Sequence, residues 1–279
     1  MSKTVWAMYF SGTGTTEKMT KHIAEGLAEK IGAEFRSFDF TVPAARKEPA
    51  VYTEDDIVVL GTPVIAGRVP NLLLKYLDTL KGGGALGIPV VMYGCRAFDD
   101  ALTELRNIME NDGFHTFAGA ACAAEHSMST KLGAGRPDVE DMKEADSFIE
   151  KAASKYAETE KEGAFPEDFT PVQVDGNDPP GPYYIPRDAE GGPIDIRKVK
   201  PETDDDKCDK CGKCAELCPL GSISFEDYKT VEGICMKCCA CIKKCPKNAK
   251  YFDDELQLYH ITDLENRFGK RRAENAWFI

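Results

Sequence analysis

The chain has 279 residues, of which 42% are hydrophobic and 29% charged, and its formal net charge is -12. This composition is ordinary for a globular protein and excludes a fibrous or wholly disordered chain. The acidic balance disfavours nucleic acid as a partner, because phosphate binding needs a basic face. No stretch reaches the length of a membrane span, and the N-terminus lacks a signal-peptide pattern. We therefore expect a cytoplasmic protein of two domains that does not bind membranes.

Strand-like and helix-like segments alternate over residues 1–160. Apolar runs predict strands at Val5–Phe10, Ala33–Phe38, Ile57–Leu60, Ile88–Tyr93 and Thr116–Ala121. Helical spacing of apolar residues predicts helices at Glu17–Ile31, Val69–Leu80, Asp99–Met109 and Asp138–Tyr156. This alternation predicts an α/β domain with a doubly wound parallel five-stranded sheet.

Three further segments follow this domain. Residues 161–200 are rich in Pro and Gly and are expected to form a linker that lies against a surface. Residues 201–252 contain most of the cysteines and form a second, smaller domain, and residues 253–279 form a tail with helical spacing. The tail ends in Trp277, Phe278 and Ile279, which are costly to expose, so we expect it to dock along the seam between the domains.

A duplicated cysteine motif is the most specific signal in the sequence. Nine of the 11 cysteines lie between Cys208 and Cys245, and the pattern C-x-x-C-x-x-C-x-x-x-C-P occurs twice. In such a repeat the fourth cysteine of each copy binds the cluster of the other copy. This predicts two [4Fe–4S] clusters. Their ligands are Cys208, Cys211, Cys214 and Cys245 for the first, and Cys235, Cys238, Cys241 and Cys218 for the second.

Zinc is the alternative metal for this motif. A zinc module would use two C-x-x-C pairs separated by a longer finger, whereas here the third cysteine follows too closely. Cys239 is an extra thiol at the position where the first copy has Gly212, and we interpret it as a non-ligand. The segment from Lys207 to Phe252 resembles bacterial two-cluster ferredoxins.

The stretch SGTGTT follows the first predicted strand and precedes the first predicted helix. A dinucleotide-binding fingerprint would need a third glycine, where the chain has Glu17, and a nucleoside triphosphatase loop would need Gly-Lys-Ser/Thr. A capped turn without a ligand is the plain alternative. Hydroxyls and backbone N–H groups at a helix N-terminus can also surround a phosphate without any basic residue. The residues in question are Ser11, Gly12, Thr13, Gly14, Thr15 and Thr16.

Two more loops are expected at the same edge of the sheet, where the parallel strands end. These are GTPVIAGRVP (61–70) after the third strand and YGCRAFDDAL (93–102) after the fourth. An aromatic side chain of the second loop, Tyr93 or Phe98, is a candidate to lie against a ligand ring. EHS (125–127) follows the fifth strand at the same rim.

Taken together, these motifs resemble the flavodoxin family over residues 1–160, and the whole chain resembles the flavodoxin–ferredoxin fusion flavoproteins of anaerobic bacteria. The resemblance implies FMN, two [4Fe–4S] clusters and electron transfer. It also implies FMN contacts from Ser11–Thr16 and from two further sets. These sets are Thr62, Pro63, Val64, Ile65, Ala66 and Gly67 in one loop, and Tyr93, Gly94, Cys95, Arg96, Ala97, Phe98 and Asp99 in the other.

The sequence departs from the family in the loop after the third strand, which lacks the bulky Trp that many flavodoxins place over the flavin. We interpret the chain as a carrier that links one-electron and two-electron chemistry. Two alternatives stay open: an FMN-dependent reductase of a small unsaturated, carbonyl or quinone substrate, and a redox sensor. Whether the chain is an enzyme is therefore undecided. Because the chain is acidic, redox partners are expected to dock through basic patches.

Overall fold

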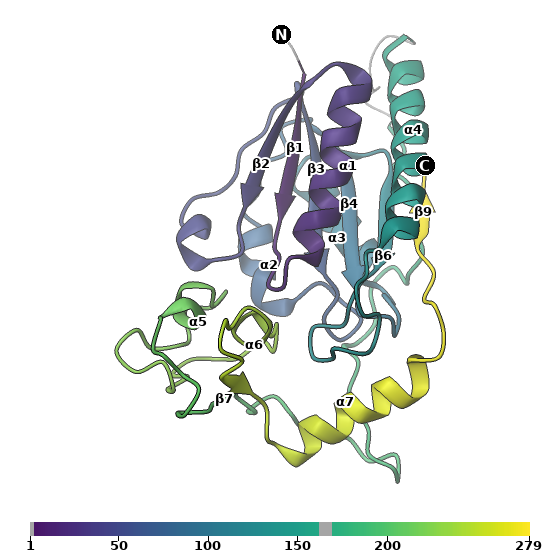
Figure 1. The fold of residues 1–279 in the computed structure, drawn as a ribbon. Coiled ribbons are helices and arrows are strands. Elements are labelled where there is room, and N and C mark those ends of the chain that lie inside the picture. The colour runs from purple at the N-terminus through teal and green to yellow at the C-terminus, as the bar shows by residue number, and fades with distance from the viewer. Residues whose placement is uncertain (1–2, 162–168) are drawn as a thin grey trace.

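The computed structural model describes residues 3–161 and 169–279 (Figure 1). Its main sheet has the strand order β2-β1-β3-β4-β6-β9, with β5 paired to β4 beside β6. All neighbours up to β6 pair in parallel. The parallel strands are β1 (Thr4–Tyr9), β2 (Glu34–Asp39), β3 (Asp56–Pro63), β4 (Leu86–Tyr93), β5 (His115–Thr116) and β6 (Gly119–Ala123). This is the strand order of flavodoxin-like doubly wound sheets.

Helices cover both faces of the sheet. One core packs α1 (Thr15–Ile31) and α4 (Val139–Lys161) against it through Ile23, Leu27 and Phe148. The other core packs α2 (Asn71–Leu77) and α3 (Ala101–Asn111) against the opposite face through Leu73 and Leu105. A short 3-10 helix, η1 (Pro43–Arg46), follows β2. Because every residue of β4 is buried, this strand forms the centre of the domain.

The predicted α/β sheet is confirmed, with two differences. The fifth predicted strand is divided into β5 and β6, which pair with opposite halves of β4. The structure also adds an antiparallel edge strand, β9 (Ala276–Phe278), which the sequence analysis did not anticipate.

The cysteine-rich segment forms a small α+β module beyond the carboxyl ends of β1 and β2 (Figure 1). It contains β7 (Glu202–Thr203), α5 (Lys213–Glu216), α6 (Ala240–Lys243) and β8 (Lys250–Tyr251), and β7 pairs with β8 in antiparallel orientation. The two copies of the motif have the same backbone path. Left-handed φ angles recur at equivalent positions, in the pairs Lys210 and Lys237, Gly212 and Cys239, and Gly221 and Asn248.

Residues 169–200 lie against the α/β domain. Val172 N–H donates to Thr116 O at 2.8 Å, and the buried carboxylate of Asp100 accepts hydrogen bonds from the N–H groups of Asn177 and Gly181 at 2.8 Å each. Residues 162–168, the first part of the expected linker, lie outside the described residues.

The C-terminal segment forms α7 (Glu255–Phe268) and then β9, which pairs with β6 (Figure 1). We expected Trp277 at the seam between the domains, and this prediction is wrong. Trp277 lies opposite Ala120 of β6, and its ring packs on Phe148 of α4 with centroids 5.1 Å apart. The small side chains of β6 leave an edge that an apolar strand can cover, and covering it removes an unpaired row of backbone groups.

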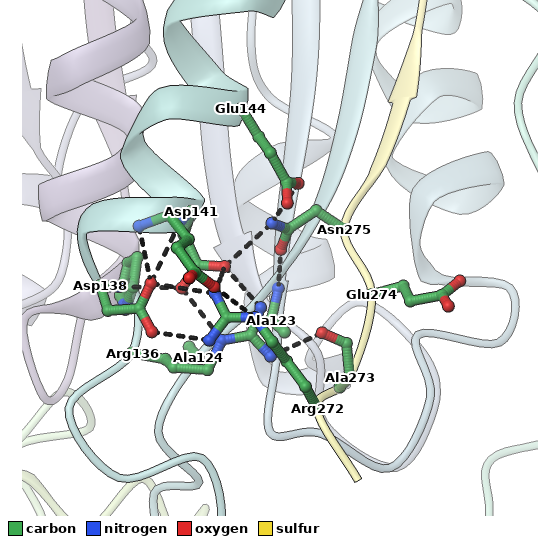
Figure 2. Close-up of polar contacts among 12 residues, drawn as sticks. Ala123, Ala124, Arg136, Asp138, Asp141, Glu144, Arg272, Ala273, Glu274 and Asn275 are labelled. Carbon is green, nitrogen blue, oxygen red and sulfur yellow. Dashed lines mark hydrogen bonds and ion pairs between the residues drawn. The ribbon is translucent and has the colours of Figure 1, made fainter.

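A buried ion pair anchors this strand (Figure 2). Arg136 and Asp141 have side chains that are 6% and 0% exposed, and the Arg136 guanidinium also donates to Ala273 O at 2.6 Å. Asn275 continues the network: it accepts from Ala123 N–H at 2.9 Å and donates to Asp141 at 3.0 Å. The network thus joins the loop before α4, β6 and the C-terminal strand.

We predict that Asp141→Asn destabilises the full chain by roughly 3 kcal/mol, because it leaves the Arg136 charge buried without its partner. Asp146→Asn is a matched control on the same helix, since Asp146 is 62% exposed and pairs with His22 at the surface. The control should cost less than about 1 kcal/mol. Urea unfolding of both variants measures the difference, and equal losses would contradict a special role for the buried pair.

Candidate functional site

The SGTGTT loop joins β1 to α1 and exposes the start of that helix. Ser11 Oγ accepts hydrogen bonds from Gly14 N–H at 3.1 Å and from Glu17 N–H at 3.0 Å, so this hydroxyl orders the loop from inside. Ser11 and Thr16 are buried, whereas Thr13 and Thr15 are partly exposed. Gly14 has φ +104°, a conformation that favours glycine, and a Cβ there would have no neighbour within 4 Å.

Gly12 has a role that the sequence analysis did not assign. A Cβ on Gly12 would lie 3.1 Å from the Cβ and 3.4 Å from the Sγ of Cys238, a predicted iron ligand. Gly12 therefore allows the cysteine module to approach the α/β domain at the proposed phosphate loop.

The other two predicted loops contact each other. After β3, the backbone turns between Ile65 and Arg68, with Ala66 and Gly67 both left-handed. Gly67 packs against Asp99 of the loop after β4, where a Cβ would lie 2.1 Å from a carboxylate oxygen. The two loops are thus brought together at the carboxyl edge of the sheet.

Within the loop after β4, the predicted residues have different surroundings. Tyr93 is 5% exposed, its hydroxyl donates to Glu274 O, and burial raises its pKa to about 12, so this ring belongs to the core. Phe98 packs on Tyr93 and stays partly exposed. Cys95 is buried, with its Sγ 3.4 Å from Ala124 O.

Tyr184 and His260 lie at the same place although no predicted loop contains them, and His126 of the predicted EHS segment joins them there. Tyr184 N–H donates to Ala66 O at 2.8 Å, and the Arg96 guanidinium lies 4.3 Å from the centre of the Tyr184 ring. The ring of His260, from α7, is 6.2 Å from that of Tyr184, and His126 packs against Gly94. For Tyr184 and His260, proximity to these loops is a property of the fold, and the aromatic residues of 161–200 were a sequence signal for Tyr184 alone.

Two hollows in the cysteine module gather the predicted ligand sets. One is lined by Cys218, Cys235, Cys238 and Cys241, and the other by Cys208, Cys211, Cys214 and Cys245. Each set takes three cysteines from one copy of the motif and one from the other, as the spacing predicts. Cys239 also lines the first hollow.

Equivalent hydrogen bonds support the two sets. Ser222 N–H donates to Cys218 Sγ and Ala249 N–H donates to Cys245 Sγ, both at 3.3 Å. Burial raises the pKa of the Cys238 and Cys241 thiols to about 12. Cys211 of the other set, by contrast, is exposed.

The donor set fits an iron–sulfur cluster in each hollow. Within residues 3–161 and 169–279, no three His, Cys, Asp or Glu side chains converge as ligands of a single metal ion. Thiolates that bind one zinc ion lie about 2.3 Å from it. Here the four cysteines of each set line one hollow, and an iron–sulfur cluster needs four thiolates.

The SGTGTT loop and its neighbours fit an anionic, hydroxyl-bearing cofactor. The first N–H groups of α1 have no acceptor within the helix, and the start of a helix attracts negative charge. At the end of β3, Thr62 Oγ1 is buried and has no hydrogen-bond partner among the described residues.

Comparisons with known proteins found one matching family and several similar solved structures. The 4Fe-4S binding domain family matches residues 201–224. Similar solved structures include an archaeal flavodoxin (16% identity, 56% of this chain and 99% of that chain, TM-score 0.39) and a Streptococcus pneumoniae flavodoxin (20%, 55% and 99%, 0.37). Another is a Fusobacterium nucleatum flavodoxin variant bound to flavin mononucleotide (18%, 56% and 98%, 0.37). A search of curated proteins found no significant match.

The chain thus joins a doubly wound parallel sheet to a segment that matches the 4Fe-4S binding domain family, and this combination supports a redox role. No helix among the described residues is long and apolar enough to cross a membrane.

We predict a pH effect from His126. Burial, helped by the nearby charges of Lys243 and Arg96, lowers the pKa of His126 to about 4, so the unfolded chain binds more protons at mildly acid pH. Stability should therefore fall as the pH drops from about 7.5 to about 5.5, and His126→Gln should reduce this fall by about 1 kcal/mol. Urea unfolding at both pH values tests this, and identical pH dependence in the two proteins would contradict it.

Proposed function

We propose that this chain holds FMN and two [4Fe–4S] clusters and transfers electrons between them. The observation that supports this most directly is the position of the first hollow, the one that Cys238 lines. It is lined by one complete predicted ligand set, and Cys238 touches Gly12 of the proposed phosphate loop.

The chain's own residues would hold FMN at three loops. The start of α1, with Thr13 and Thr15, would bind the phosphate; Thr62 and the turn at Ala66 would contact the rest of the cofactor from one side, and Phe98 from the other. FMN accepts one or two electrons, whereas each cluster exchanges one at a time. The pairing would therefore link one-electron and two-electron carriers.

The structure favours a carrier over the alternative reductase. The proposed flavin loops are flanked by Cys238 on one side and by Tyr184 and His260 on the other, so parts of the same chain adjoin them.

Each cluster with its four thiolates contributes about -2 and the FMN phosphate about -2, so the loaded protein would be about six charges more negative than -12. Such a protein would dock with partners through their basic patches.

The test is an anaerobic reductive titration of the purified protein, followed by absorbance and EPR, with iron and FMN quantified in the same sample. The proposal expects about eight irons and one FMN per chain, reduced in sequence. If clusters are present but no FMN can be bound, the chain is a ferredoxin carried on an α/β domain. If only about four irons are found per chain, the proposal of a second cluster is wrong.

The variants Cys238→Ser and Cys239→Gly separate a ligand from its neighbour. Cys238→Ser should lose about half of the iron, because each cluster depends on four thiolates. Cys239→Gly should keep all of it, since Gly212 occupies the same left-handed position in the first copy. Iron loss in Cys239→Gly would instead make Cys239 a ligand.

A further inference from the structure

The two copies of the cysteine motif match in their ligands but differ in the residues between them. When the copies are aligned on their cysteines, Met236 replaces Asp209 and Lys243 replaces Glu216. Met236 packs against the core that α2 and α3 form with the sheet, whereas Asp209 is exposed. The second copy therefore packs against the α/β domain through Met236.

Lys243 makes the most complete contact between the two parts. It stands at the end of α6, two residues after the predicted ligand Cys241, and its side chain is 16% exposed. Its ammonium group donates to Glu125 Oε1 at 2.6 Å, His126 O at 2.7 Å and Ser129 O at 2.9 Å. An ammonium has three N–H donors, so this group is fully satisfied by the loop after β6.

The electrostatic state of Glu125 agrees with this contact. Burial alone would raise the pKa of its carboxyl, but hydrogen bonds from Gly135 N–H and from Lys243 outweigh burial and lower it. Glu125 is therefore ionised at neutral pH and forms a charge-assisted hydrogen bond, which is stronger than a neutral one.

A second cation ties the first copy of the motif to the segment that follows β2. The Arg46 guanidinium, at the end of η1, donates to Phe40 O at 2.6 Å, to Thr41 O at 2.7 Å and to Pro219 O. Pro219 directly follows Cys218, the ligand that crosses between the copies. Together with the Gly12–Cys238 contact, the module is held at three points along the carboxyl edge.

We propose that Lys243 is a positioning residue that fixes the second copy of the motif against the loop after β6. The module then works as a docked relay and not as a tethered carrier that swings between partners. The consequence for electron transfer rests on the proposed function, whereas the docking itself does not.

The test compares Lys243→Met with Lys213→Met in the full, iron-loaded chain. Met keeps most of the apolar stem and removes the ammonium in both variants. Lys213 is exposed, lies on α5 of the other copy and forms no ion pair with a described residue, so the control makes the same charge change. Glu125→Gln removes the charge from the other side of the contact and serves if Lys243→Met does not fold.

Two measurements are made on each variant. The first is amide hydrogen exchange of residues 125–129 and 240–245, which should become about tenfold faster in Lys243→Met, the change expected for losing one charge-assisted hydrogen bond. The second is the rate of internal electron transfer after photochemical reduction, measured at several solvent viscosities. In the wild type and Lys213→Met this rate should not depend on viscosity, whereas in Lys243→Met it should fall and become viscosity-dependent.

Unchanged exchange in both Lys243→Met and Glu125→Gln would overturn the proposed contact. A viscosity-dependent rate in the wild type would overturn the docked relay, as would an unaltered rate in a Lys243→Met variant whose exchange is faster. If the wild type showed no transfer between clusters and flavin, the proposed function would fail, and hydrogen exchange alone would still decide whether Lys243 fixes the module.

Discussion

The close approach of Gly12 to Cys238 is the contact on which the relation between the two parts of the molecule depends. A parallel sheet brings the loops that follow its strands to one edge, and the cysteine module docks on that edge. Because residue 12 has no side chain, a predicted iron ligand reaches the loop that begins α1. A larger residue would push the module away from the place where the proposed cofactors need to be near each other.

The cysteine module is attached to the α/β domain by the segment that precedes it and by the segment that follows it. The chain approaches along residues 169–200, which are fixed to the α/β domain through Asp100, and it leaves through α7 to return as β9. The Arg136–Asp141 pair and Asn275 hold the returning segment against β6 and α4. Two attachments restrict the module more than a single flexible linker would, because each removes conformational freedom from the intervening chain.

Much of this arrangement follows from local sequence patterns. The apolar run of β4 and the periodic apolar residues of α1 predict the α/β domain, because burial on a sheet or a helix face repeats at short spacing. The cysteine spacing predicts the two ligand sets that the hollows bring together. The ligand assignments and the FMN contacts themselves stay predictions.

The remaining features depend on contacts between distant residues. β9 has only three residues and pairs with a strand far away in sequence, so its apolar character indicated docking but not the place. No local sequence pattern distinguishes Lys243 from other lysines, because its partner Glu125 is distant in sequence. Tyr184 lies in a segment without periodicity. Tyr93 has the residue type of a ring-stacking side chain, but its hydroxyl is directed to Glu274.

The edge strand β9 has a thermodynamic consequence. In the sequence, the cysteine module lies between β6 and β9. It is therefore part of the chain segment that connects these two paired strands. The entropic cost of closing a loop is smaller when the loop is already ordered. Metal binding orders a domain that folds around its metal. With the proposed clusters, iron incorporation and the pairing of Trp277 with the sheet edge would be linked equilibria, and the indole of Trp277 would report on whether the module is folded.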